Sequence, residues 1–438
     1  MASDKFRFTT ITAVVVANMV GTGVFTSLGF QLLDIRSGFA LLMLWAVGGL
    51  IAVCGAMTYA ELGAALPRSG GEYNFLSHIY HPSAGFVSGW ISSTIGFAGP
   101  TALAAMTFAA YMLSIFPEYG GVWAERIIAA SLVVGLSVIH ATNRRNSGGL
   151  QLIFTLLKVA IIVLFIVAAV VIVDLPQPVT FFPSEGDLSV IMSSEFAVSL
   201  IYVSYAFSGW NAATYLSNEM DNPQKTLPGI LLSGTLIVTL MYVGLNFAFL
   251  YSAPIDTMVG EVEVGYIAAE AAFGETGGRF TGVVLAMLLI STVSAMTMAG
   301  PRVIQMMGED FPLLHILGRT NKHGVPAIAI YAQGVITLIF IFSSTFESVL
   351  VFSGFTLAIN TFATVSSIFV LRWRQPDLPR PYKTFLYPWT PIIFLGLTAW
   401  TLGFVVINRP VEALFGFGII ASGLFFYWLS LRGSQIVR

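Results

Sequence analysis

The chain has 438 residues, of which 56% are hydrophobic and 10% are charged, with a mean hydropathy of +0.83 and a formal net charge of −2. Soluble globular proteins carry about 25% charged residues, so the composition excludes a soluble protein and predicts an all-α membrane protein. No basic run indicates a nucleic-acid partner. The single cysteine, Cys54, excludes an internal disulfide and a thiolate metal cluster. We expect no metal and no cofactor.

Apolar runs long enough to cross a bilayer alternate with short polar turns along the whole chain. A membrane helix needs about 20 apolar residues. No small-residue cleavage site follows the first run, so we expect that run to be retained as an anchor. We predict twelve transmembrane helices, at residues 8–33, 38–65, 84–115, 122–141, 150–174, 191–216, 228–253, 279–307, 326–344, 346–371, 388–407 and 411–432.

The basic residues give the expected orientation. Lys and Arg collect in cytoplasmic segments of membrane proteins. With the N-terminus in the cytoplasm, the cytoplasmic segments hold 15 of the 20 basic residues, the outer segments hold four, and Lys158 lies within a span. We therefore predict a multi-pass protein of the cell (inner) membrane with both termini in the cytoplasm.

The first span contains a weak point at Val20–Val24, where two glycines flank Thr22. Each Gly costs a helix about 1 kcal/mol relative to Ala, and irregular backbone inside a membrane must be buried in protein or line a cavity. The sixth span has a matching weak point at Phe207–Gly209. Helices interrupted at corresponding places in two halves of a carrier mark its substrate site. The alternative is that these small residues only form a helix-packing surface.

The spans divide into two halves of five. Spans one to five cover residues 8–174 and spans six to ten cover residues 191–371. Because five is odd, the second half enters the membrane from the opposite side, as an inverted repeat requires. We expect residues 1–372 to form a ten-helix transport core and residues 373–438 to hold two peripheral helices and the C-terminal tail.

The two weak points suit a ligand that carries both charges. Free N–H groups at Gly21–Gly23 would begin a half-helix, where the helix dipole favours a carboxylate. Free carbonyl groups near Met19 and Val20, and around Tyr205–Gly209, would accept from an ammonium group. A zwitterionic α-amino acid matches such a pair of helix ends.

Lys158 lies about eight residues into the fifth span, at a depth of about 12 Å. A charge inside the membrane is a functional hypothesis by default; the alternative is that the side chain reaches back to the interface. No acidic residue is predicted deep in any span. We expect Lys158 to donate to carbonyl or hydroxyl groups of the first and eighth spans, with Ser291, Thr292 and Ser294 as candidate hydroxyls.

Two polar motifs lie at cytoplasmic span ends, Tyr59–Tyr73 after the second span and Asn218–Pro228 after the sixth. Their charged residues can form an inner gate, although ordinary loop chemistry also accounts for them. No zinc-protease or nucleophile-elbow motif and no pair of intramembrane aspartates is present, so we expect no enzyme. The charge rings or repeated filter of a channel are also missing.

These motifs together resemble the amino acid–polyamine–organocation (APC) superfamily, and within it the L-type amino acid transporters and their bacterial homologues. The resemblance is carried by Gly21–Phe25, by Tyr59–Tyr73 and by Phe207–Asn211 with Glu219–Pro228. It covers spans one to ten, whereas the last two spans match only in hydropathy. It implies a LeuT-type fold, with ten core helices in a 5+5 inverted repeat, discontinuous helices 1 and 6, and two peripheral helices.

The resemblance also implies roles for individual residues. Lys158 matches a lysine whose ammonium replaces a bound sodium ion, which implies sodium-independent transport. The loop Phe116–Trp123 has no cysteine, so the disulfide that joins some relatives to a heavy subunit cannot form. Ammonium-binding carbonyls are expected at Met19, Tyr205 and Ser208, and carboxylate-binding groups at Thr22 and Gly23, with Tyr205 closing the site and with Val20, Gly21, Ala206, Phe207 and Gly209 completing the two breaks.

The sequence thus predicts a sodium-independent, alternating-access transporter of neutral L-amino acids, most simply an exchanger. Lys158, Tyr205, Ser291 and Thr292 are its candidate gating or ion-replacing residues. A proton-coupled symporter and a carrier of cationic amino acids or polyamines remain alternatives within the same fold. The competing classes are a uniporter or a non-transporting amino acid sensor of the same fold, and an unrelated membrane enzyme. The expected partners are the substrate and the lipid bilayer.

Overall fold

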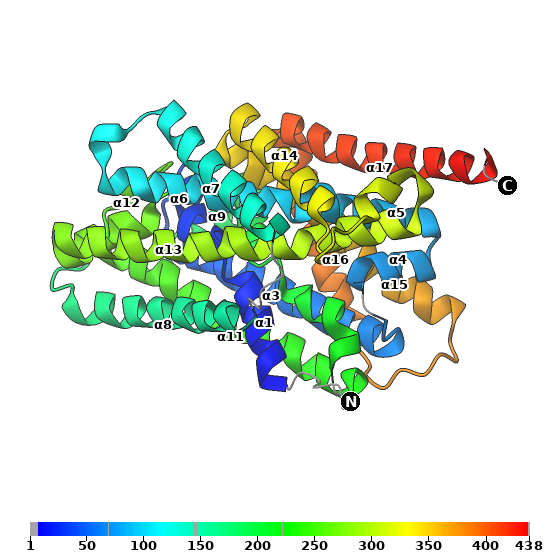
Figure 1. The fold of residues 1–438 in the computed structure, drawn as a ribbon. Coiled ribbons are helices and arrows are strands. Elements are labelled where there is room, and N and C mark those ends of the chain that lie inside the picture. Colours follow the sequence, from blue (N-terminus) through cyan, green and yellow to red (C-terminus); the bar gives the residue numbers. More distant parts are fainter. Residues whose placement is uncertain (1–7, 69, 143–147, 221, 437–438) are drawn as a thin grey trace.

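The protein is described here from a computed structural model (Figure 1), which covers residues 8–68, 70–142, 148–220 and 222–436. Side chains are described for all of these except residues 148–155, 216–219, 312 and 433–436. Within these ranges every regular element is a helix and no strand is present, which confirms the all-α prediction. Some residues used above for the orientation or the motifs lie outside the described residues: Lys5, Arg7, Ser69, Arg144, Arg145, Asp221 and Arg438.

The helices follow one another with short connections. They are α1 Phe8–Met19, α2 Gly23–Gln31, α3 Gly38–Ala65, α4 Gly71–Ile79, α5 Pro82–Ile91, η1 Ser92–Gly96, α6 Ala98–Ile115, η2 Pro117–Tyr119, α7 Val122–Thr142, α8 Gly148–Ile172, α9 Asp187–Ile191, α10 Ser194–Ala206, η3 Trp210–Glu219, α11 Pro223–Ser252, α12 Ile255–Met258, α13 Val264–Asp310, η4 Pro312–Gly318, α14 Ala327–Ser343, α15 Phe346–Arg374, α16 Trp389–Asn408 and α17 Pro410–Ile436.

Nine helical segments within the described ranges are long and apolar enough to cross a membrane. Two shorter apolar helices, Leu156–Ile172 and Ala327–Ser343, fall in the fifth and ninth predicted runs. The sixth predicted run is divided between α10 and η3, so it contains no unbroken helix of spanning length. The structure therefore shows a membrane protein with many spans.

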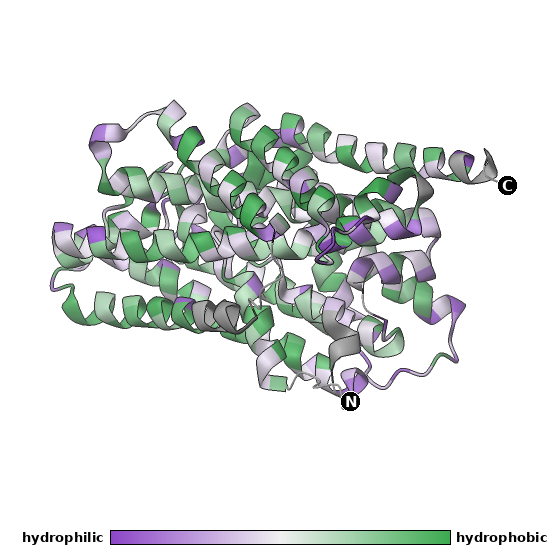
Figure 2. Cartoon of the chain, viewed as in Figure 1, coloured by the Kyte–Doolittle hydropathy of each residue, from purple (hydrophilic) through white to green (hydrophobic). Residues whose placement is uncertain are grey.

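The interior of the bundle includes α2, in which every residue is buried, and most of α10. α13 packs most extensively on α6, and α11 on α3. The outer helices α7, α8 and α17 expose many apolar side chains, and hydrophilic residues gather at the two ends of the bundle (Figure 2). Apolar side chains facing outward are stable in lipid, whereas uncovered backbone groups are not.

Both predicted interruptions are present. α1 ends at Met19 and α2 begins at Gly23, while α10 ends at Ala206 and η3 begins at Trp210. The third run, which we expected to be continuous from 84 to 115, is also interrupted, by the single π-helical turn η1. Pro100 has no N–H to donate to the Gly96 carbonyl, which weakens the helix at this point. Residues 251–278, which include five acidic side chains, contain α12 and the first part of α13, and α13 is kinked at Gly274 with φ 73°.

Candidate substrate site at two interrupted helices

The two interruptions touch each other. A Cβ atom added at Gly23 would lie 2.7 Å from both Cα and Cβ of Ala206. Gly209 adopts a φ of 100°, and a Cβ there would lie 2.8 Å from the Asn18 carbonyl oxygen. Glycine is therefore required at Gly23 for close approach, and at Gly209 for close approach and for the left-handed backbone.

The first interruption leaves helix ends without their usual partners. The Gly21 N–H donates to the Met19 carbonyl over 2.7 Å, and the Phe25 N–H donates to the Thr22 carbonyl over 2.9 Å. The first N–H groups of α2, at Gly23 and Val24, have no acceptor within their own helix. The start of α2 therefore offers donors and a positive dipole end to an anionic group.

The second interruption is closed by two backbone bonds. The Phe207 N–H donates to the Val203 carbonyl and the Ser208 N–H to the Tyr205 carbonyl, each over 2.9 Å. The Phe207 ring lies 5.0 Å from the Tyr242 ring, centroid to centroid. Tyr205 is buried and Ser208 is half-buried.

Tyr242, on α11, joins the two interruptions and was not identified from the sequence. Its hydroxyl lies 2.5 Å from the Met19 carbonyl oxygen and 3.1 Å from the Ala206 carbonyl oxygen. The single hydroxyl proton is shared between two acceptors, so neither carbonyl has a full hydrogen bond from it. A tyrosine in the apolar run 228–253 carries no sequence signal that would have indicated this contact.

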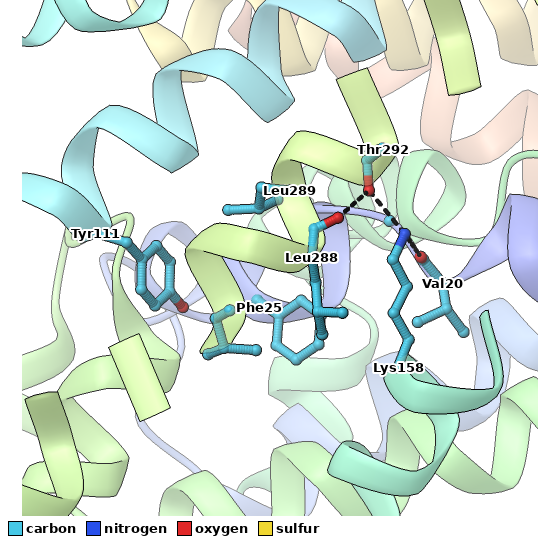
Figure 3. A pocket seen from close by; sticks show the side chains of 9 residues that line it. Val20, Phe25, Tyr111, Lys158, Leu288, Leu289 and Thr292 are labelled. Carbon is cyan, nitrogen blue, oxygen red and sulfur yellow. Dashed lines mark hydrogen bonds between the residues drawn. The ribbon is translucent and has the colours of Figure 1, made fainter. Parts of the chain in front are cut away.

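Lys158 reaches the first interruption from α8. Its Nζ donates to Thr292 Oγ1 on α13 over 2.7 Å and to the Val20 carbonyl over 3.4 Å, and both contacts are visible in Figure 3. The residue is only 5% exposed, so its ammonium does not reach the interface in this structure. No carboxylate within the described residues pairs with it.

The other two candidate hydroxyls differ from Thr292. Ser291 Oγ is buried without a partner among the described residues. Ser294 Oγ lies 2.8 Å from His140 Nε2 on α7. Of the three hydroxyls, only that of Thr292 contacts Lys158.

A small pocket lies beside Lys158 (Figure 3). The candidate residues in its wall are Val20, Gly21, Lys158 and Thr292, whereas Tyr205–Gly209 are not part of it. Its other lining side chains are mostly apolar and come from three helices: Phe25 of α2, Tyr111 of α6, and Leu285, Leu288 and Leu289 of α13.

The first polar motif, Tyr59–Tyr73, contains a buried ion pair. Glu61 of α3 is fully buried and binds Arg372 of α15 through two hydrogen bonds of 2.9 and 2.7 Å. The Thr384 N–H donates to the same carboxylate over 2.6 Å, and Arg380 lies 3.6 Å from it. The motif therefore connects the core to the segment before α16. The side chains of Asn218 and Glu219, in the second motif, are not described.

The chain is similar to known amino acid transporters. The chain is 29% identical to "Large neutral amino acids transporter small subunit 2" of Homo sapiens, over 95% of this chain and 78% of that protein. It is 28% identical to "Serine/threonine exchanger SteT" of Bacillus subtilis (strain 168), over 95% of this chain and 94% of the relative. It is 26% identical to "b(0,+)-type amino acid transporter 1" of Mus musculus, over 95% and 85%. The amino acid permease family matches residues 6–429. The chain belongs to this family, within the APC superfamily, and is a transporter rather than an enzyme.

Proposed function

We propose that the protein is a sodium-independent exchanger of neutral L-amino acids that works by alternating access. The contact between the two interrupted helices carries this proposal, because it brings the N–H groups at the start of α2 beside the carbonyl end of α10. The finer fold belongs to the same proposal: twelve spans, a LeuT-type 5+5 inverted repeat within residues 1–372, and two peripheral helices within residues 373–438.

The substrate charges are assigned to the two interruptions. The carboxylate binds the N–H groups at the start of α2, at Thr22 and Gly23, and the ammonium binds the carbonyls of Met19, Tyr205 and Ser208. The Tyr242 hydroxyl already donates to Met19. The Gly21 N–H donates to the same carbonyl, so both of its lone pairs are used. The substrate ammonium therefore takes the place of the Tyr242 hydroxyl at Met19, and that hydroxyl then donates to the Ala206 carbonyl. Tyr205 closes the site over the bound substrate.

Lys158 takes the place of a coupling cation. Its ammonium joins the Val20 carbonyl to the Thr292 hydroxyl, and so joins the first interrupted helix to α13. A fixed positive charge at this point stabilises the free carbonyl end of α1. No sodium ion is then needed to hold the two helices together.

Selectivity for neutral substrates follows from the charges around the pocket. None of its lining residues is a carboxylate, and Lys158 is the only charged residue among them. A cationic side chain would therefore bind without a counter-ion. Exchange is favoured over uniport because one relative carries the word exchanger in its name.

The remaining features are proposed from the sequence. The protein lies in the cell (inner) membrane with both termini in the cytoplasm. It needs no disulfide-linked heavy subunit, because its only cysteine, Cys54, is buried in α3.

The test is uptake of a radiolabelled neutral amino acid into proteoliposomes without sodium, with and without unlabelled amino acid inside. Strong uptake only into preloaded vesicles is expected. Equal uptake into empty vesicles would reject exchange. The substrate class would be rejected if a cationic amino acid or a polyamine competed better than alanine, serine or leucine.

Lys158→Ala tests the ion-replacing role. We expect it to retain the fold and to slow exchange by about tenfold or more. A hydrogen bond from a charged group contributes about 1.5–3 kcal/mol, and each 1.4 kcal/mol is a factor of about ten. Lys322→Ala removes an exposed lysine and is the matched control. Exchange at the wild-type rate by Lys158→Ala would reject the role.

A further inference from the structure

A second buried carboxylate of the same polar motif, Glu72 on α4, lies in a different environment from Glu61. Glu72 is only 4% exposed. Its Oε1 accepts from the Tyr59 hydroxyl over 2.5 Å and from Asn211 Nδ2 over 3.1 Å, and its Oε2 accepts from Asn360 Nδ2 in a short hydrogen bond. Three neutral donors therefore surround this carboxylate.

No cation among the described side chains pairs with Glu72. Arg372 and Arg374 of α15 are engaged elsewhere, by Glu61 and by the Ile79 carbonyl. The titratable groups that face Glu72 are the phenols of Tyr59 on α3 and Tyr215 on η3, which carry no charge at neutral pH.

The other titratable groups near α4 interact with groups other than Glu72, and the Arg68 charge acts on the Tyr73 phenol. Tyr73 of α4 donates to Asp310 of α13 over 2.9 Å. His78 lies 3.4 Å from the Gln375 side-chain nitrogen. His81, before α5, bonds Ser83. None of these groups neutralises the Glu72 carboxylate.

Burial of an unpaired carboxylate disfavours its charged form. Desolvation raises the pKa of Glu72 to about 7, although the bonds from Tyr59, Asn211 and Asn360 oppose the rise. α4 lies between the helices long enough to span the membrane, not within one. The proton on this group therefore exchanges near neutral pH.

The donors around Glu72 lie on three different elements, one of which, η3, follows the second interruption. Tyr59 is on α3 and Asn360 is on α15, whereas Asn211 is on η3, two residues after Gly209 of the interruption. The Trp210 ring packs edge-on against Tyr59 at 4.6 Å. Movement of η3 during opening of the cytoplasmic side would expose Glu72 to water.

We propose that Glu72 is a proton-binding site, which takes up a proton as the cytoplasmic side closes and releases it as that side opens. The coupling of this proton to opening and closing rests on the proposed transport function, whereas the proton site itself does not depend on transport. Glu72 has a higher pKa when it is buried in the closed state than when it is exposed in the open state. Because the closed state then binds more protons, a lower pH favours the closed state. Each unit of pKa difference changes the closed-to-open ratio tenfold, so exchange should slow as the pH falls.

The first experiment measures amino acid exchange with equal pH on both sides of the liposomes, from pH 5.5 to 8.5, which removes any effect of mixed orientation. We expect the wild-type rate to fall about tenfold towards acid pH, with a midpoint near 7. Glu72→Gln keeps the side-chain shape without the charge, and its rate should be nearly constant. Glu309→Gln changes an exposed carboxylate of α13 and should follow the wild type. Equal pH profiles for wild type and Glu72→Gln would overturn the proposal.

The second experiment does not depend on transport. Cys54 is 5% exposed, so a thiol-reactive dye reports thermal unfolding in detergent. A group whose pKa is raised on folding stabilises the protein below its unfolded pKa, and this stabilisation is lost as the pH rises through its folded pKa. We expect the unfolding temperature of the wild type, compared with that of Glu72→Gln, to decrease as the pH is raised from about 4.5 to about 7. If neither the wild type nor any variant exchanges amino acids, the proposed function fails, and this measurement alone tests Glu72. Parallel curves of unfolding temperature against pH for wild type and Glu72→Gln would overturn the proton site, whereas diverging curves would support it.

Discussion

The contact between the two interrupted helices can be tested by one methyl group. Gly23→Ala would place a Cβ 2.7 Å from Cα and Cβ of Ala206 and 3.3 Å from its nitrogen. Carbon atoms in ordinary contact lie about 3.5–4.0 Å apart. The two backbones would have to separate by about 1 Å, because the neighbouring atoms belong to the helix ends themselves and not to a flexible side chain.

The expected size of the effect follows from this overlap. Forcing an extra methyl group into a packed interior costs about 1–3 kcal/mol, and each 1.4 kcal/mol is a factor of about ten in an equilibrium. We expect Gly23→Ala to lower the thermal unfolding midpoint measurably. We also expect it to lower amino acid exchange by about fivefold or more, because the separated helix ends no longer match both substrate charges.

Two glycines provide controls. A Cβ at Gly21 would lie 3.8 Å from the nearest atom, the Met19 carbonyl oxygen, which is an ordinary contact. Gly21→Ala should therefore leave the unfolding midpoint near that of the wild type, measured with a thiol dye on Cys54. A Cβ at Gly135 on α7 would meet nothing within 4 Å, so Gly135→Ala controls the transport assay. An unfolding midpoint for Gly23→Ala equal to that for Gly21→Ala would refute the close contact.

Two further substitutions test polar contacts. Tyr242→Phe removes the side-chain donor from the carbonyls of Met19 and Ala206, at a cost of about 1–3 kcal/mol without substrate. It leaves the Met19 carbonyl with the Gly21 N–H alone, so the rise in unfolding midpoint on adding substrate should exceed that of the wild type. An equal rise would contradict binding of the substrate ammonium at Met19. Glu61→Gln leaves buried arginine charge without its counter-ion, which costs about 3–5 kcal/mol. The control is Glu275→Gln, whose pair with Arg279 is exposed and contributes at most about 1 kcal/mol. The thermal unfolding midpoint should drop far more for Glu61→Gln than for this control.

Some of the structure could be predicted because single residues carry strong local preferences. Glycines at 21, 23 and 209 weaken a membrane helix wherever they occur, so both interruptions could be located from the sequence. Lys158 could be singled out because a charge in an apolar run is costly in any fold. The span count was less certain, since the sixth run is divided between α10 and η3 and the fifth and ninth apolar helices are short.

Other features depend on partners that are distant in sequence. Glu61 and Glu72 belong to one motif, yet Glu61 binds arginines from α15 and the segment after it, while Glu72 binds only neutral donors. Apart from Tyr59, which is 13 positions from Glu72, the partner residues are 139 to 323 positions away, and composition cannot assign them. The π-helical turn η1 was also missed, because its cause is a missing hydrogen bond and not a change in hydropathy.

Lys158 and Tyr242 reach the first interruption from different helices, α8 and α11. Lys158 donates to the carbonyl of Val20 and Tyr242 to that of Met19. Unpaired carbonyls buried away from water would otherwise favour rewinding of the helix. Because side chains of the protein hold these groups, the interruption persists without a bound ion or substrate. The substrate then meets a preformed site and loses less affinity to ordering it, which is the physical basis on which sodium becomes unnecessary here.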